Sequence, residues 1–327
     1  MQAIEFEQGK LQTVNKPIPT IQDNEVLVRT SMAGICATDL ELMSGMYAFQ
    51  GVAGHEFVGI VAEAASSELA GKRVVGDINC ACGSCSFCMQ NNPRHCPNRS
   101  VIGIRSREGA FAEYVSVPRE NLYFVPEDLS DTQAVFAEPL AAALRIGEQL
   151  HVQHQADIAV LGDGKLGLLI AFSLSLYAKN VCLLGHRHQN LDIAAHQGIN
   201  VVNTAKEDFS QSAFWGGNKY DLVVEATGSP KGLDEALDLT RPQGTVVLKT
   251  TTSQASSLES SKIAVKELKI QGSRCGDISW ALYNLQKGRI RVEPLIEAVY
   301  PFDNFEQAIQ HAAQRGAKKI LLDFVHS

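Results

Sequence analysis

The pattern of hydrophobic and polar residues changes near residue 138 of this chain of 327 residues. Before that point, short runs of branched and aromatic residues alternate with Gly and Pro, which is typical of strands joined by turns. This irregular pattern before residue 138 predicts a mostly β domain. The clearest predicted strands are residues 25–29, 57–61 and 111–115.

Beyond residue 138, strand-like runs alternate with helical segments, which predicts a parallel sheet covered by helices on both faces. The predicted strands are residues 158–161, 181–184, 222–225 and 245–248. The predicted helices are residues 141–150, 165–177 and 191–197. The fold class is therefore α/β, with a doubly wound parallel sheet beside a mostly β domain.

The pattern becomes mixed again after residue 272, where helices at 281–287 and 305–314 precede a closing strand at 319–324. We interpret this tail as a return to the first domain. Two domains also suit the length, because single cores usually stop growing near 250–300 residues. The predicted limits are 1–141 for the first domain, 142–275 for the second and 276–327 for the return.

Composition excludes several classes of protein. The chain is 45% hydrophobic and 20% charged, with a net charge of -7, which argues against a nucleic-acid or anionic-membrane partner. No apolar run is long enough to span a bilayer. The first residues lack the basic and apolar regions of a signal peptide, so we expect a cytoplasmic protein.

Four of the eight cysteines follow the spacing C-x2-C-x2-C-x7-C within a lobe at residues 80–97. Four thiolates from one loop can close a tetrahedron around zinc and leave no open position. We therefore predict a structural zinc, against the alternatives of free thiols or an iron–sulfur cluster. Cys80 is interpreted as a spectator. The acidic balance disfavours a nucleic-acid-binding zinc ribbon. The predicted ligands are Cys82, Cys85, Cys88 and Cys96.

Residues 162–167 form a G-x-G-x-x-G loop between a predicted strand and an apolar helix. Gly162 would permit the tight turn, Gly164 would let the backbone approach a pyrophosphate, and Gly167 would let helix and strand pack closely. The helix N-terminus would face the anion. This context predicts a dinucleotide site, against the alternative of a plain βα turn. Lys165 and Leu166 are included among its candidates.

The end of the next predicted strand bears on the choice of dinucleotide. NAD sites usually place an acidic residue there for the ribose 2′-hydroxyl, but this chain has Gly185, His186 and Arg187. A small residue followed by cations suits a 2′-phosphate, because Arg offers paired N–H donors. We predict NADP over NAD; the alternative is that Arg187 is a solvated surface residue.

A second set of metal-binding residue types lies between residues 34 and 56, together with Glu138. Cys36 offers a thiolate, His55 an imidazole and Glu138 a carboxylate, and about three such ligands with one exchangeable position make a catalytic zinc site. Taken alone, Cys36 would usually be a core residue and Asp39 could cap a helix.

These features in this order resemble the zinc-dependent alcohol dehydrogenases of the medium-chain dehydrogenase/reductase family. The likeness covers nearly the whole chain and implies a GroES-like catalytic domain with a Rossmann domain. Glu138 points to the polyol and threonine dehydrogenase-like branch. The matching segments are residues 34–39, 54–59, 109–114 and 138–140, together with the four-cysteine lobe.

The resemblance implies that Cys36, His55 and Glu138 bind the catalytic zinc, with Glu56 as a fourth ligand or a carboxylate that exchanges with water. Asp39 would hold the zinc-bound histidine in one tautomer. Thr38 would pass the substrate proton outward. Many family members have His at the position of Glu41, which leaves the end of this relay open. Thr227 and Arg274 stand where family members contact the cofactor.

We therefore expect a dehydrogenase with two zinc ions that uses NADP, with NAD possible, on a secondary alcohol or polyol or the matching ketone or aldehyde. A homodimer or homotetramer is expected from the family. The rivals are a zinc-independent quinone or enone reductase on the same fold and a non-catalytic cofactor-binding protein. Pocket candidates are Tyr47, Phe49, Ile104 and Arg105. Arg105 and Arg107 hint at an anionic substrate group, but we favour the interpretation that they are exposed loop arginines.

Overall fold

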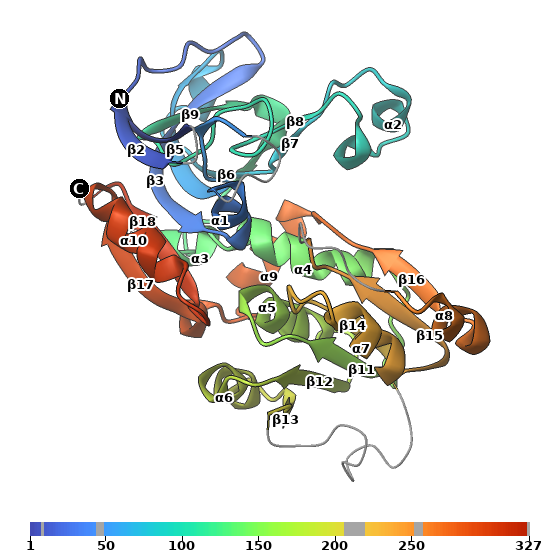
Figure 1. Cartoon of the computed structure of the whole chain (residues 1–327). Helices are drawn as coiled ribbons and strands as arrows, with labels where there is room; N and C mark the ends of the chain where they lie inside the picture. Colours follow the sequence, from blue (N-terminus) through green and yellow to red (C-terminus); the bar gives the residue numbers. More distant parts are fainter. Residues whose placement is uncertain (8–9, 44–48, 206–219, 252–257, 326–327) are drawn as a thin grey trace. The chain divides into compact units, whose positions relative to one another are not determined.

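The computed structural model describes residues 1–327 except 8–9, 44–48, 206–219, 252–257 and 326–327. The chain forms two compact units, one of Met1–Glu138 with Ile278–Ser327 and one of Pro139–Asp277. The C-terminal segment thus rejoins the unit that the N-terminal segment builds. Figure 1 shows the elements of each unit along the chain.

The first unit is built on a seven-stranded sheet in the order β10-β6-β5-β3-β18-β17, with β9 paired to β3. All its pairs are antiparallel except β17 with β18. Its strands are β3 (Glu25–Ile35), β5 (Glu56–Ala64), β6 (Arg73–Gly76), β9 (Tyr114–Pro118), β10 (Leu122–Phe124), β17 (Ile296–Pro301) and β18 (Lys319–Asp323). The predicted strand at 111–115 is wrong in its limits, because the strand begins only at Tyr114.

Two smaller sheets complete the β-structure described for this unit, in the orders β2-β1-β4 and β7-β8. Their strands are β1 (Gln2–Glu7), β2 (Lys10–Asn15), β4 (Gly51–Val52), β7 (Asn79–Cys80) and β8 (Ser100–Val101). The helices are α1 (Ala37–Met43), α2 (Ser86–Met89), α3 (Asp131–Ala134), α9 (Ile278–Gln286) and α10 (Phe305–Ala312). A capping box between Ser130 and Gln133 starts α3, since each side chain satisfies a backbone N–H of the other.

The position of β18 matters for the chemistry of the first unit. Its residue Ile320 pairs with Ile35 of β3, while Gly34 of β3 pairs with Glu56 of β5. Lys319 at the start of β18 is therefore brought beside Glu56, although the two lie 263 positions apart.

The second unit contains a six-stranded sheet in the order β13-β12-β11-β14-β15-β16, with every pair parallel. Numbered within the unit this is 3-2-1-4-5-6, the Rossmann order, which confirms the predicted doubly wound sheet. The strands are β11 (Asp157–Leu161), β12 (Asn180–Gly185), β13 (Asn200–Asn203), β14 (Tyr220–Glu225), β15 (Thr240–Leu248) and β16 (Lys269–Gly272).

The helices of the second unit are α4 (Ala137–Gln149, which begins at the boundary), α5 (Lys165–Leu174), α6 (His188–His196), α7 (Gly232–Leu239) and α8 (Ser260–Lys266). Helix α5 is apolar nearly all round, and eight of its ten residues are buried, as expected for a helix packed deep in a domain. Leu161, Leu184 and Val223 belong to a buried core shared by the strands and α7.

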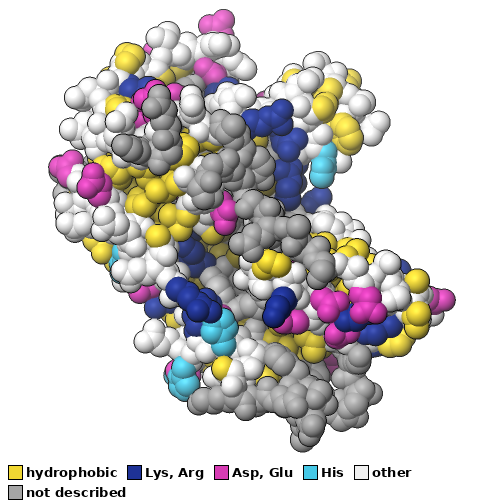
Figure 2. Space-filling model, in the orientation of Figure 1, with side chains coloured by type: hydrophobic (Ala, Val, Ile, Leu, Met, Phe, Trp, Pro, Cys, Tyr) yellow, Lys and Arg dark blue, Asp and Glu magenta, His cyan; other side chains and the backbone are white. Residues whose placement is uncertain are grey.

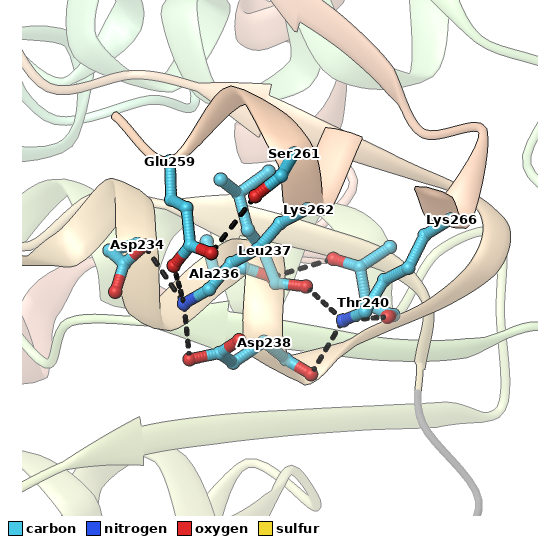
Figure 3. A network of polar contacts seen from close by, with 9 residues as sticks. All are labelled: Asp234, Ala236, Leu237, Asp238, Thr240, Glu259, Ser261, Lys262 and Lys266. Atoms are coloured by element: carbon cyan, nitrogen blue, oxygen red, sulfur yellow. Dashed lines mark hydrogen bonds and ion pairs between the residues drawn. The ribbon is translucent and has the colours of Figure 1, made fainter. Parts of the chain in front are cut away.

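Lysines attach α8 to α7 (Figure 3). Lys266 donates from Nζ to the carbonyl oxygens of Leu237, Asp238 and Thr240, at 2.6, 3.2 and 3.2 Å. A cation at this place satisfies the open carbonyls of a helix C-terminus and opposes its dipole. Lys262 bridges Asp234 and Asp238, each at 2.9 Å. The two helices are thus held by polar contacts at the surface.

No helix in the described part of the chain combines the length and the apolar character needed to cross a membrane.

Candidate functional site

The first unit brings a thiol, an imidazole and a carboxylate together. Cys36 follows the last residue of β3 and His55 precedes the first residue of β5, which is Glu56. Because the two strands are antiparallel neighbours, the end of one lies beside the start of the other. One ligand atom each of Cys36, His55 and Glu56 lies within 4.8 Å of the others.

Asp39 orients this group from the first turn of α1. Its Oδ2 accepts the backbone N–H of Cys36 at 2.8 Å, and its Oδ1 lies 3.1 Å from Nδ1 of His55. Burial alone would lower the pKa of His55, but the charges of Asp39 and Cys36 outweigh burial and hold this pKa well above its ordinary value. With Nδ1 engaged by Asp39, Nε2 is the ring nitrogen left for a metal.

Sequence reasoning missed the partner of Glu56. Lys319 donates from Nζ to Oε2 of Glu56, and both side chains are almost completely buried, with 3% and 1% exposed. The same ammonium lies 5.8 Å from the ring centre of Phe136. Burial lowers the pKa of Lys319, but Glu56 and Cys36 outweigh it and raise this pKa above its ordinary value. Gly34 makes room, since a Cβ there would lie 2.5 Å from Glu56 Oε2.

Glu138 does not join the group as predicted. Among the described residues, the carboxylate that lies with Cys36 and His55 is that of Glu56. Glu138 is near enough to interact electrostatically with His55 and Glu56. Burial raises the pKa of Glu138 to about 7, the charge of His55 opposes this shift, and the charge of Glu56 adds to it. A carboxyl group with a pKa of about 7 is a weaker permanent ligand at neutral pH than a carboxylate paired with a buried lysine.

The predicted proton-relay residues lie on one helix. The hydroxyl oxygen of Thr38 is 3.7 Å from the Cys36 sulfur. Glu41 follows three positions later on α1, so the two side chains share a face of the helix. Both are partly buried. Their roles stay predictions.

The four predicted structural-zinc cysteines also converge. Cys82, Cys85, Cys88 and Cys96 have sulfurs that all lie within 4.8 Å of one another. Two of the pairs, Cys85 with Cys88 and Cys82 with Cys96, are 3.5 Å apart. Cys80 stays outside this group; it is buried, and burial raises the pKa of its thiol to about 11.

The lobe that carries these cysteines is open to solvent. Phe87 and Met89 of α2 are exposed there, and Figure 2 shows hydrophobic side chains on this lobe. Hydrogen bonds from the backbone N–H and the hydroxyl of Ser84 lower the pKa of Cys82 to about 5, whereas burial raises that of Cys88. The Cys82 thiolate therefore forms readily without metal, whereas Cys88 needs a nearby cation to ionise.

Both groups suit zinc by their donor chemistry and spacing. Zn–S bonds of about 2.3 Å give a tetrahedron with edges of about 3.8 Å, close to the 3.5 Å between paired sulfurs. The Cys36 group offers one sulfur, one nitrogen and one oxygen donor. That set leaves a coordination position for a substrate, whereas four cysteines do not.

The glycine loop of the second unit has the geometry that its sequence predicts. Gly162 adopts a φ of 114°, and a Cβ on Gly167 would lie 1.9 Å from the carbonyl oxygen of Gly162. Both positions therefore require glycine. Gly164 caps α5, and the space around its missing Cβ is open. Lys165 and Leu166 begin the helix and are partly buried. The N–H groups at a helix start point along the axis and suit a phosphate.

Arg187 is not a solvated surface residue with a free side chain. Its Nη1 donates to Oδ1 of Asp163 at 2.6 Å, and Asp163 stands inside the glycine loop. His186 beside it is exposed, and Gly185 ends β12. Asp163 is a second residue that sequence reasoning missed.

The other predicted contacts are more varied. The hydroxyl of Thr227 donates to Glu225 at 2.6 Å and accepts from the backbone of Ser229, so it holds a turn. Arg274 is exposed, and its carbonyl accepts from Lys249. Of the pocket candidates, Tyr47 lies outside the described residues, Phe49 is buried and Arg105 is exposed.

Arg107, the other arginine considered for an anionic substrate group, is partly buried and ion-paired. It donates to Glu25 at 2.8 Å and to Ser100 at 3.2 Å, so its charge already has a partner within the first unit. A paired arginine of this kind holds two loops together and offers little to a ligand.

Two family models match the chain: the alcohol dehydrogenase GroES-like domain over residues 22–127 and the zinc-binding dehydrogenase domain over residues 166–286. Among curated proteins, the chain is 28% identical to D-arabinitol dehydrogenase 1 of Uromyces fabae, over 98% of this chain and 96% of the relative.

Solved structures agree with these two family matches. The RspB alcohol dehydrogenase from E. coli CFT073, solved with NADH, is 30% identical, with a TM-score of 0.92 over 99% of each chain. A protein from Sinorhizobium meliloti 1021 bound to NADP is 29% identical, with a TM-score of 0.90 over 98% of each chain. Similar chains have thus been solved with either nicotinamide cofactor.

Proposed function

This chain belongs to the zinc-binding medium-chain dehydrogenases and is an oxidoreductase, and we propose that its substrate is a secondary alcohol or polyol, or the matching ketone or aldehyde. The cofactor is NADP, with NAD as the weaker partner. The single observation that carries the proposal is the buried group of Cys36, His55 and Glu56, which suits a zinc ion with room for a substrate oxygen. The polyol class is supported by the likeness to D-arabinitol dehydrogenase 1.

Cys36, His55 and Glu56 would hold the catalytic zinc, which would supply a Lewis acid for the substrate oxygen. Asp39 keeps the His55 ring in the tautomer that presents Nε2, as supported by the 3.1 Å contact at Nδ1. Lys319 pairs with Oε2 of Glu56, which would leave the other carboxylate oxygen for the metal. Glu138 is the neighbouring carboxyl group that exchanges with Glu56 or water.

Thr38 takes the proton that the substrate hydroxyl releases, and Glu41 or water carries it to solvent. Both side chains lie on α1, which also carries Asp39. A short relay of this type needs donors and acceptors within reach of the substrate oxygen. The Thr38 hydroxyl, 3.7 Å from the Cys36 sulfur, is placed beside the metal ligands.

The four cysteines of the lobe hold a second, structural zinc. The glycine loop would hold the cofactor pyrophosphate through Gly162, Gly164, Lys165, Leu166 and Gly167. The residues proposed for the rest of the cofactor are Gly185, His186, Arg187, Thr227 and Arg274. The cofactor supplies or accepts the hydride. The active protein is a homodimer or homotetramer in the cytoplasm.

The test is a joint measurement of metal content and turnover. The purified protein is assayed for zinc by mass spectrometry and screened against alcohols, polyols and carbonyls with NADP(H) and NAD(H), followed at the absorbance of the reduced nicotinamide. We expect about two zinc ions per chain and activity that a chelator removes and zinc restores.

Two outcomes would reject the proposal. One zinc per chain, with turnover of quinones or enones that resists chelation, would favour the zinc-independent reductase. Cofactor binding without turnover of any compound in the panel, at full zinc content, would favour the non-catalytic protein.

A further inference from the structure

The buried carboxylate of Asp163 joins the glycine loop to the end of β12. Its Oδ2 accepts the backbone N–H groups of His186 and Arg187 at 2.9 and 2.5 Å, and its Oδ1 accepts from the Arg187 guanidinium at 2.6 Å. The backbone carbonyl of Asp163 accepts from the Asn190 side chain at 2.8 Å. With 1% of its side chain exposed, Asp163 has no room to contact a ligand directly.

We propose that Asp163 is a positioning residue that holds the Arg187 guanidinium in place to bind the 2′-phosphate of NADP. The inference rests on the NADP preference proposed above and adds the residue that produces it. Asp163 itself would touch no atom of the cofactor; it would act through Arg187.

The Arg187 guanidinium is held in place but keeps N–H donors for a ligand. Among the described residues, the contacts of its nitrogens are limited to the one from Nη1 to Asp163, and 29% of the Arg187 side chain remains exposed. Arginine has five N–H donors, so donors remain for a phosphate. An arginine already held in one rotamer loses less conformational entropy on binding than a free one.

Asp163 offsets part of the charge of Arg187, but its carboxylate also accepts from two backbone N–H groups and occupies only one guanidinium nitrogen. Its carboxylate is stabilised by two backbone N–H groups as well as by the guanidinium. The 2′-phosphate would meet the exposed side of Arg187, while the carboxylate lies buried behind it. An acidic residue at the ribose itself, as in NAD sites, would instead repel that phosphate.

Gly185 leaves the space that the Asp163 side chain occupies beside Arg187. A Cβ on Gly185 would lie 2.3 Å from the Cβ of Asp163 and 2.6 Å from its Oδ2. Glycine at the end of β12 is therefore a condition for the Asp163 side chain to reach Arg187. The glycine that replaces the usual acidic residue has a second use, which is to make room for a carboxylate from the neighbouring loop.

The experiment is a double-mutant cycle read by equilibrium binding, without turnover. Dissociation constants for NADPH and NADH are measured by nicotinamide fluorescence for the unmodified protein, Asp163→Asn, Arg187→Ala and the double variant. Adenosine 2′,5′-bisphosphate and adenosine 5′-monophosphate, measured by calorimetry, repeat the comparison without the nicotinamide. Asn keeps an oxygen for the two backbone N–H groups, and unchanged NADH binding is the control for folding.

We expect Arg187→Ala to weaken NADPH by about 10- to 100-fold, as for loss of a charge-assisted hydrogen bond. Asp163→Asn should weaken NADPH by about tenfold and NADH by less than about twofold. In the Arg187→Ala background, Asp163→Asn should then have no further effect on the ratio of the two constants, because its influence passes through the guanidinium.

Two results separate the inference from the proposal beneath it. If Arg187→Ala leaves the ratio of NADPH to NADH binding unchanged, the NADP preference fails and the inference fails with it. If Arg187→Ala removes the preference but Asp163→Asn retains or strengthens NADPH binding, Asp163 merely competes with the phosphate and the inference alone is overturned.

Arg187→Lys gives an answer even if Asp163→Asn does not fold. A lysine keeps the charge but cannot contact Asp163 and the phosphate through separate nitrogens. Positioning predicts that it loses NADPH nearly as much as Arg187→Ala. Retention of most of the affinity would show that charge alone suffices and would overturn the inference.

Discussion

The two metal-type groups of the first unit are built in opposite ways. The four cysteines come from 15 consecutive residues of a solvent-exposed lobe, and the group contains sulfur donors alone. The group of Cys36, His55 and Glu56 is assembled at the ends of two antiparallel strands. It is surrounded by Asp39, Lys319 and Glu138, which carry or can carry charge.

This difference separates a structural role from a chemical one. A zinc ion with four thiolate ligands is fully coordinated. The free energy of zinc binding therefore stabilises a loop that has little hydrophobic core of its own. The buried ionisable groups around Cys36 stabilise the fold poorly, because each charge loses its hydration and must be paired. Such a concentration of perturbed ionisable groups is typical of a catalytic site.

The largest expected difference between the two groups is in the effect of Cys36→Ser on turnover. We expect turnover to fall by at least about 10⁴-fold, because the Lewis acid that contributes several kcal/mol is lost. The melting temperature should change little, and NADPH binding should persist. Zinc content and turnover are measured together, with Cys80→Ser as the matched control, since Cys80 lies outside both groups. A variant that keeps substantial activity would contradict the catalytic assignment.

Lys319→Met tests the buried charges. Without metal, it leaves Glu56 buried and unpaired, which should lower the free energy of unfolding by about 3–5 kcal/mol. The measurement is urea denaturation of the chelator-treated protein. Adding Glu56→Gln to Lys319→Met should recover most of the loss, since no lone charge then remains. Equal stability of the single variant and the unmodified protein would show that Glu56 is already solvated or protonated.

Cys85→Ser tests the lobe. We expect one zinc fewer and a melting temperature lower by about 5–10 °C, while turnover per folded molecule falls much less than for Cys36→Ser. Scanning calorimetry with metal analysis measures both effects. Cys80→Ser is again the control, because a serine hydroxyl there can donate to the carbonyl of Ile78 that the thiol now faces. Unchanged stability with one zinc fewer would remove the structural role.

Asp39→Asn should lower the zinc affinity of the Cys36 group by about 10- to 100-fold and leave that of the four cysteines unchanged. The reason is that an amide no longer fixes the tautomer and basicity of His55. Competition with a chromophoric chelator resolves the two sites. Equal weakening of both sites would indicate a general loss of structure.

The smallest effect is a pair of opposite pH trends. His55 and Glu138 both have raised pKa values, that of Glu138 at about 7. For each group, binding a proton more tightly in the folded state than in the unfolded state raises the free energy of unfolding. This contribution is fully present below the unfolded pKa and is lost as pH rises through the folded pKa. Metal-free protein should therefore lose stability as pH rises past 7. Zinc affinity should instead rise by about tenfold per pH unit for each proton released.

These two trends are measured by denaturation of metal-free protein and by chelator competition between pH 6 and 8. A metal-free protein whose stability rises over this range would contradict the assignment of protons to His55 and Glu138. Zinc affinity independent of pH would mean that neither group gives up a proton when the metal binds.

The parts of this molecule that sequence predicts well are local. The parallel sheet, its glycine loop and the four-cysteine spacing depend on residues close together in the chain, and the doubly wound parallel sheet is as expected. The contact between Asp39 and His55 is within reach of motif reasoning because both lie in the segment that carries Cys36.

What could not be predicted depends on pairing across long separations. Lys319 meets Glu56 because β18 returns beside β3, and no local pattern of residues marks that lysine as buried. Asp163 has the side chain of an ordinary loop residue until the parallel pairing of β11 with β12 brings it to Arg187. Glu138 was expected beside Cys36 and His55, whereas the carboxylate that lies with them is that of Glu56, which strand pairing places beside Gly34.

The central claim is that the Cys36 group binds a catalytic zinc that is distinct from the structural zinc of the lobe. Anomalous scattering from crystals, measured on both sides of the zinc absorption edge, tests it most directly. The account predicts two peaks per chain, one among the four lobe sulfurs and one bonded to Cys36 Sγ and His55 Nε2 at about 2.3 and 2.0–2.1 Å. A single peak in the lobe, from protein that turns over its substrate at full rate, would contradict it.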